Sequence, residues 1–76
     1  MKGGTDLNTA ELRAAIARAG KTNRSLAEGL DISEQAFYNK IQGLSDFKSS
    51  EIKRLAIELC LNLRDINIIF FDKEVN

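Results

Sequence analysis

The segment LDISEQAFYNKIQG, residues 30–43, carries side chains that could hydrogen-bond to the edge of a nucleobase. Its apolar residues Phe37, Ile41 and Leu44 recur at helical spacing, and we expect them to bury one narrow stripe. An amide both donates and accepts, so it can make paired hydrogen bonds to an adenine edge, whereas charged side chains mainly hold phosphates. For each amide alone, the alternative is an ordinary solvated helix face. The polar side of the segment consists of Gln35, Tyr38, Asn39 and Gln42.

The chain contains few of the residues on which catalysis and metal binding usually depend. It contains no His, which removes the most common general base, and its single Cys excludes a zinc site of ordinary composition. It has no Gly-rich phosphate loop and no carboxylates at metal-binding spacing. We therefore expect no enzyme activity, no metal, no cofactor and no small-molecule substrate. Cys60 falls within an apolar helical pattern, and we expect it in the core rather than at a reactive site.

Length and charge limit the kind of protein this is. Seventy-six residues make one domain with a small core, because a chain this short buries about 60% of its unfolded surface. Eleven acidic residues balance eleven basic ones, so no global positive field draws the chain to nucleic acid. No apolar run approaches the roughly 18 residues that span a bilayer, and the start MKGGTDLN lacks the apolar centre of a signal peptide. We expect a cytoplasmic protein without a membrane partner.

Helix-start and helix-end signals predict an all-α fold of five short helices. Glu11 and Asp65 stand where they would complete capping boxes at the first and fifth helices. The expected N-caps are Asn8, Thr22, Ser33 and Asn62, and the expected helix ends are Gly20, Asp31 and Gly43, with Asp31 left-handed. The fourth helix contains residues 52–59 and the fifth ends at 69 or 70. We expect tails at residues 1–7 and 72–76 around a domain of residues 8–71.

Apolar residues at helical spacing predict which side of each helix faces the core. In the fifth helix we expect Leu63, Ile66 and Phe70 to complete the core. The earlier helices contribute Leu12, Ala15, Ile16, Ala19, Leu26, Ala27, Leu30, Ile52, Leu55, Ala56 and Leu59.

The connection GLDIS between the second and third helices is very short. Such a spacer makes two helices cross at a large angle, which is the helix-turn-helix arrangement. Ala27 is small enough for the close crossing, Ile32 would fill the corner, and Phe37 would hold the third helix on the core. The amide face of the third helix would then be free.

The segment TNRSLAEGLDISEQAFYNKIQG resembles the helix-turn-helix of the Xre-like family, which includes the lambdoid phage repressors and Cro proteins. The resemblance covers Leu12 to about Leu59, and the ending DFKSSEIKRLAIELCLNLRDINIIFF is similar to that of small Cro-like proteins. It implies a lambda-repressor-like domain that binds double-stranded operator DNA as a two-fold dimer, with the third helix in the major groove. The base contacts that it implies are Glu34, Gln35 and Asn39, with Tyr38 and Gln42 nearby. The phosphate contacts that it implies are Thr22, Asn23 and Arg24, flanked by Lys40, Lys48 and Ser49.

Elementary physics supports part of this interpretation. Helix starts present unpaired N–H groups and partial positive charge, and Lys21 and Lys48 each stand beside one. Simple capping with solvated Lys explains the same pattern. The negative charge of Glu34 interacts favourably with the helix dipole but is repelled by phosphates. Glu34 could instead accept a hydrogen bond from a cytosine amino group.

The apolar ending DINIIFFDKEV indicates a further contact. Ile68 and Phe71 point away from the expected core, so they either cover the first helix or pair with a second copy of the chain, which we favour. The functional alternatives are thus a DNA-binding transcriptional regulator and a protein-interaction module that keeps the fold without binding DNA. Neutral charge and Glu34 favour the module.

Overall fold

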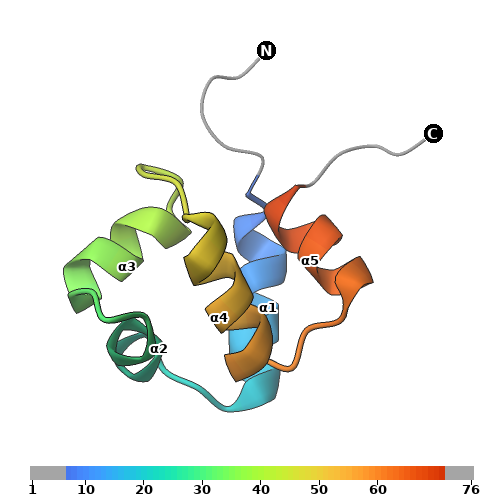
Figure 1. Cartoon of the computed structure of the whole chain (residues 1–76), viewed down its shortest axis with the longest axis horizontal. Coiled ribbons are helices and arrows are strands. Elements are labelled where there is room, and N and C mark those ends of the chain that lie inside the picture. The colour runs from blue at the N-terminus through green and yellow to red at the C-terminus, as the bar shows by residue number, and fades with distance from the viewer. Residues whose placement is uncertain (1–6, 72–76) are drawn as a thin grey trace.

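Five α-helices follow one another in the computed structural model, which describes residues 7–71 (Figure 1). They are α1 (Thr9–Ala19), α2 (Asn23–Leu30), α3 (Glu34–Ile41), α4 (Ser49–Glu58) and α5 (Leu63–Phe70). The described part of the chain contains no strand, so the expected all-α class with five helices is confirmed. None of these helices is long and apolar enough to cross a membrane. The expected tails at 1–6 and 72–76 lie outside the described residues, whereas Leu7 packs against the core.

Local side-chain bonds explain where the helices begin. The side-chain oxygens of Asn8, Thr22, Ser33 and Asn62 each accept from a backbone N–H in the first turn of α1, α2, α3 and α5, at 2.8–3.1 Å. The capping box of α5 is confirmed, because Asp65 accepts in return from the N–H of Asn62. The box expected at Asn8 is wrong, because its N–H donates instead to the carbonyl of Ile69 at 2.7 Å. That bond ties the start of α1 to the end of α5.

Left-handed residues end the first four helices. Gly20, Asp31, Gly43 and Cys60 have φ values of 69°, 61°, 84° and 56°. In each case the N–H of the next residue donates back to a carbonyl five positions earlier, which satisfies a helix end that would otherwise be open. The prediction for Asp31 is confirmed. Cys60 is exposed and shapes a turn, so the core position expected for it is wrong.

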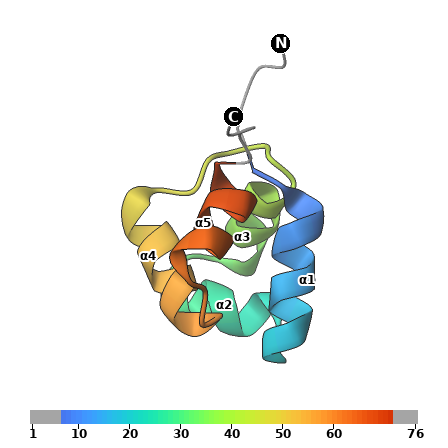
Figure 2. The same cartoon turned by 90° about the vertical axis from the view of Figure 1, so that its right-hand side faces the viewer.

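The helices are arranged along the long axis of the molecule (Figures 1 and 2). α3 lies at one end of the long axis and α5 at the other, with α1 and α4 between them. α2 packs against α3 and α4, and α5 packs against α1 and α4. A side-chain bond also links α1 to α3, because the hydroxyl of Thr9 donates to the carbonyl of Ile41 at 2.8 Å. This arrangement leaves one side of α3 without a neighbouring helix.

A single apolar core joins all five helices. Two expectations for it are wrong: Leu44 is 73% exposed and Leu63 is 74% exposed. Leu44 follows the left-handed Gly43, so it no longer continues the helical stripe of Phe37 and Ile41. Leu63 stands on the first turn of α5, and Ile69 is buried on that helix. The buried apolar residues are Leu12, Ala15, Ile16, Leu26, Ala27, Phe37, Ile41, Leu55, Leu59, Ile69 and Phe70.

The left-handed Cys60 gives a test of this fold. Replacing Cys60 with Gly should raise the free energy of unfolding by about 1 kcal/mol over Cys60→Ala, since only Gly adopts this conformation without Cβ strain. Urea denaturation of the two variants measures the difference. An alanine variant as stable as the glycine variant would contradict the turn geometry.

Candidate nucleic-acid interface

A short connection fixes α3 across α2. Residues 31–33 join the two helices, and the N–H of Ile32 donates to the carbonyl of Ala27 at 3.0 Å. Ala27 is 2% exposed and Phe37 is fully buried, so the two helices meet through a small residue and an anchored ring. Phe37 also makes an edge contact with Phe47 in the next loop, at 5.9 Å between ring centroids. The inner side of α3 is therefore held firmly by α2 and by the α3–α4 loop.

The outer side of α3 presents the polar residues expected from the sequence. Gln35 and Gln42 are exposed, Tyr38 is 42% exposed and Asn39 is half-buried. Two bonds run along this face: Gln35 Nε2 donates to Asn39 Oδ1 at 3.1 Å, and Gln42 Nε2 donates to the hydroxyl of Tyr38 at 3.3 Å. They leave free an acceptor on Gln35, donors on Asn39 and the hydroxyl proton of Tyr38. The outer face of α3 thus presents hydrogen-bond donors and acceptors on uncharged side chains.

Glu34 is the first residue of α3 and is exposed beside this face. A carboxylate at this position interacts favourably with the partial positive charge of the helix start. It forms no ion pair within residues 7–71. The ionised carboxylate of Glu34 can only accept hydrogen bonds, so it suits the amino group of a base and repels a phosphate.

The start of α2 lies next to the same face. Asn23, the first residue of α2, lines a small pocket together with Glu34, Gln35 and Tyr38. The hydroxyl of Thr22 is used as a cap, in a reciprocal arrangement with Ser25. The backbone N–H groups at positions 23 and 24 have no partner in the described part of the chain. Of the three contacts expected at this helix start, Asn23 lies next to the polar face of α3.

The basic residues of α2 and its approach are engaged in ion pairs. Arg24 lies 3.8 Å from the carboxylate of Glu28, and both side chains are well exposed. Lys21 lies 3.6 Å from Glu58 on α4. The exposed Arg24–Glu28 pair is weak and opens readily to an incoming phosphate. Lys48 and Ser49, at the start of α4, are exposed.

Lys40 differs from its expected role at the groove. Its side chain is only 11% exposed, and its ammonium lies 3.2 Å from the carboxylate of Glu51, whose side chain is 10% exposed. The ammonium also donates to the carbonyl of Asp46 at 2.8 Å and lies 5.9 Å from the centre of the Phe47 ring. Lys40 therefore holds the α3–α4 loop in place, and its charge is used inside the protein rather than at its surface.

Glu51 is a structural residue that sequence reasoning missed. Burial alone would raise the pKa of Glu51, but the backbone N–H of Lys48 and the ammonium of Lys40 outweigh it, and the pKa is lowered below its ordinary value. The N–H of Lys48 donates to the Glu51 carboxylate at 2.8 Å. One carboxylate thus caps α4 and neutralises Lys40. The sequence signal was the spacing of Lys48 and Glu51, which is that of a capping pair.

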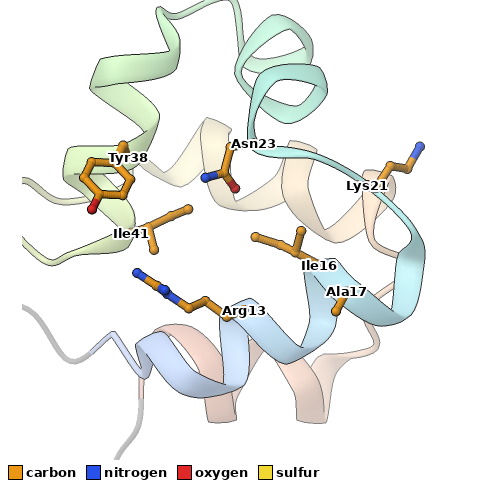
Figure 3. Close-up of a pocket in the computed structure, with 7 residues that line it drawn as sticks. All are labelled: Arg13, Ile16, Ala17, Lys21, Asn23, Tyr38 and Ile41. Carbon is orange, nitrogen blue, oxygen red and sulfur yellow. The ribbon is translucent and has the colours of Figure 1, made fainter.

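Arg13 is the other residue that sequence reasoning missed. A cavity of about 280 Å³ lies between α1, the start of α2 and α3, and Arg13 lines it together with Asn23 and Tyr38 (Figure 3). Ile16 and Ile41 form its apolar floor. The sequence places Arg13 on the outer side of the first helix, but only the packing of α1 beside α3 brings it near Tyr38.

The residues expected at a dimer interface lie far from this face. Ile68 is 38% exposed and Phe71 is 44% exposed, at the α5 end of the molecule (Figure 1). A contact through them would leave α3 open. Comparison with models of known protein families, with characterised proteins and with solved structures finds no match to this chain.

The buried pair predicts a large effect of a single substitution. Lys40→Met should lower the free energy of unfolding by about 3–5 kcal/mol, because it leaves Glu51 charged and buried without a partner. The double variant Lys40→Met/Glu51→Leu should recover most of this loss. Arg24→Met is the matched control, and breaking its exposed pair should cost less than about 1 kcal/mol. Equal effects of Lys40→Met and Arg24→Met in chemical denaturation would contradict the buried pair.

Glu51 also predicts a pH dependence. Its pKa is lowered in the folded chain, so its contribution is complete above its unfolded pKa of about 4.3 and is lost as the pH falls through the folded pKa. Glu51→Gln imitates the protonated side chain. The wild type should therefore exceed this variant in stability at pH 7, and the difference should shrink below about pH 4. Denaturation curves from pH 7 to pH 3 measure it, and a constant difference would contradict the assignment.

Proposed function

We propose that this protein is a sequence-specific DNA-binding transcriptional regulator that reads the major groove with α3. The single observation that carries the proposal is the exposed amide face of α3, held outward by the short turn after α2. In this proposal the α2–α3 unit is a helix-turn-helix of the Xre-like, repressor or Cro kind, as the sequence resemblance implies. The protein acts as a homodimer on an inverted repeat.

The size and chemistry of α3 support this reading. An α-helix with its side chains is about 10–12 Å wide, which matches the roughly 12 Å width of the major groove. The bond between Gln35 and Asn39 leaves an acceptor on the first amide and donors on the second, side by side along the helix. Adenine offers a donor and an acceptor on its major-groove edge. We propose Gln35 and Asn39 as the principal base contacts, with Glu34, Tyr38 and Gln42 at the margins.

The charges around α3 indicate modest affinity. Lys21, Arg24 and Lys40 all lie close to carboxylates within the protein. Lys40 is used inside the protein, and Lys21 and Arg24 must each leave a carboxylate before they bind a phosphate, so the salt dependence of binding should be shallow. A dimer formed through Ile68 and Phe71 would place two such modules on one site and raise the overall affinity.

A second function keeps some support. Glu34 is exposed on α3 without an ion pair in the described part of the chain, and the whole chain has zero net charge, which suits a module that binds another protein. Heparin chromatography at low salt separates the two functions. Retention supports DNA binding, and elution in the void volume supports the protein-interaction module.

Selection from a random DNA library tests the main proposal. The wild-type protein should enrich a duplex with two related half-sites whose centres lie one helical turn apart. Gln35→Ala and Asn39→Ala should each weaken binding to that duplex by about tenfold to a hundredfold, because each removes a base contact.

Asn67→Ala is the matched control for loss of an amide, because Asn67 is exposed on α5, at the other end of the molecule. Asn67 adjoins Ile68, so sedimentation should show that this variant keeps the oligomeric state of the wild type. It should bind like the wild type, and circular dichroism should show that all three variants keep the fold. Enrichment of no sequence, or unchanged affinity in both α3 variants, would overturn the assignment of α3 as the reading helix.

A further inference from the structure

Arg13 is an exposed cation that the proposed contacts leave unused. Four other basic side chains, Lys21, Arg24, Lys40 and Arg54, lie within 4 Å of a carboxylate, whereas Arg13 has no such partner among residues 7–71. It projects from α1 toward Tyr38 and Ile41, at the mouth of the cavity between α1, α2 and α3 (Figure 3). Lys21 lines the same cavity, but its ammonium points away, toward Glu58. Arg13 is therefore the free positive charge of this cavity.

Hydrogen-bond donors from two other helices meet Arg13 there. The hydroxyl oxygen of Tyr38 accepts from Gln42, so its own proton remains free for an acceptor. The side-chain amide of Asn23 lies between Tyr38 and Ile16 in Figure 3, and the backbone N–H of Asn23 has no partner within residues 7–71. Within residues 7–71 no acidic residue lines this cavity, and Glu34 lines the neighbouring pocket, which shares Asn23 and Tyr38 with it. The cavity thus gathers one cation and neutral donors around an apolar floor, which is the chemistry of an anion site.

We propose that Arg13, together with Tyr38 and Asn23, binds a backbone phosphate of the DNA strand that flanks the bases read by α3. This inference rests on the proposed function. Tyr38 joins the two sites, because it belongs to the outer face of α3 and also lines the cavity. A phosphate held there anchors α1 and α3 to the same strand and fixes the depth of α3 in the groove. Tyr38 thus contacts the backbone in addition to its marginal place beside the bases.

The neutral α2–α3 unit makes this contact important. Because Lys21, Arg24 and Lys40 each face a carboxylate of the protein, a phosphate contact from Arg13 on α1 adds a positive charge without breaking an ion pair. Such a contact strengthens binding to every duplex to the same degree, since phosphates carry no sequence information. The sequence preference should stay with Gln35 and Asn39.

The experiment compares Arg13→Gln with Arg18→Gln, its matched control on the same helix. Arg18 is also exposed and lacks a carboxylate partner in residues 7–71, but it lines a pocket toward α4 and α5. Arg13→Gln should weaken binding by about tenfold, equally for the selected and a random duplex, and lower the salt slope by about one. Arg18→Gln should change neither quantity, and both variants should keep the wild-type melting temperature.

Duplexes with one uncharged methylphosphonate at successive positions identify the phosphate. One position should weaken the wild type and Arg18→Gln but leave Arg13→Gln unaffected, and Tyr38→Phe should lose part of the effect at that position. An unchanged salt slope in Arg13→Gln overturns this inference and leaves the proposed function standing. Absence of binding to any duplex overturns both. Chemical shifts at Tyr38 that respond equally to inorganic phosphate and to DNA, with no position-specific methylphosphonate effect, would assign the cavity to free anions and also overturn it.

Discussion

The contact between Lys40 and Glu51 ties the last turn of α3, the exposed helix of this small domain, to the first turn of α4. The ammonium comes from the last turn of α3 and the carboxylate from the first turn of α4, so a single buried pair fixes both ends of the loop between them. The carbonyl of Asp46 and the ring of Phe47 complete its surroundings. With Phe37, Phe47 and Phe70 stacked edge to face beside it, the inner side of α3 is fully engaged. The outer side is left to solvent.

Local features of this fold could be predicted from the sequence. Caps such as Thr22, Ser33 and Asn62 act on a backbone N–H only a few positions away, and the left-handed Asp31 follows from the helix that precedes it. The same local logic located α2, α3 and the short turn, and hence the amide face. Predicting these elements did not require the contacts that the chain makes across the core.

Long-range packing decided the features that the sequence did not reveal. Lys40 looked like a surface cation because its partner, Glu51, lies on another helix. The capping box at Asn8 failed because the carbonyl of Ile69 competes for its N–H. Cys60 fitted an apolar pattern, yet the chain must turn there to bring α5 against α1. Arg13 and Tyr38 share a cavity only because α1 and α3 pack together.

The bond from Asn8 to Ile69 brings the two described ends of the chain to one point. In Figure 1 this junction lies apart from α3. The bond between Asn8 and Ile69 suits circular permutation of residues 7–71, because a short linker can join neighbouring ends. The described domain thus has its two ends together at one place and its exposed helix, α3, at another.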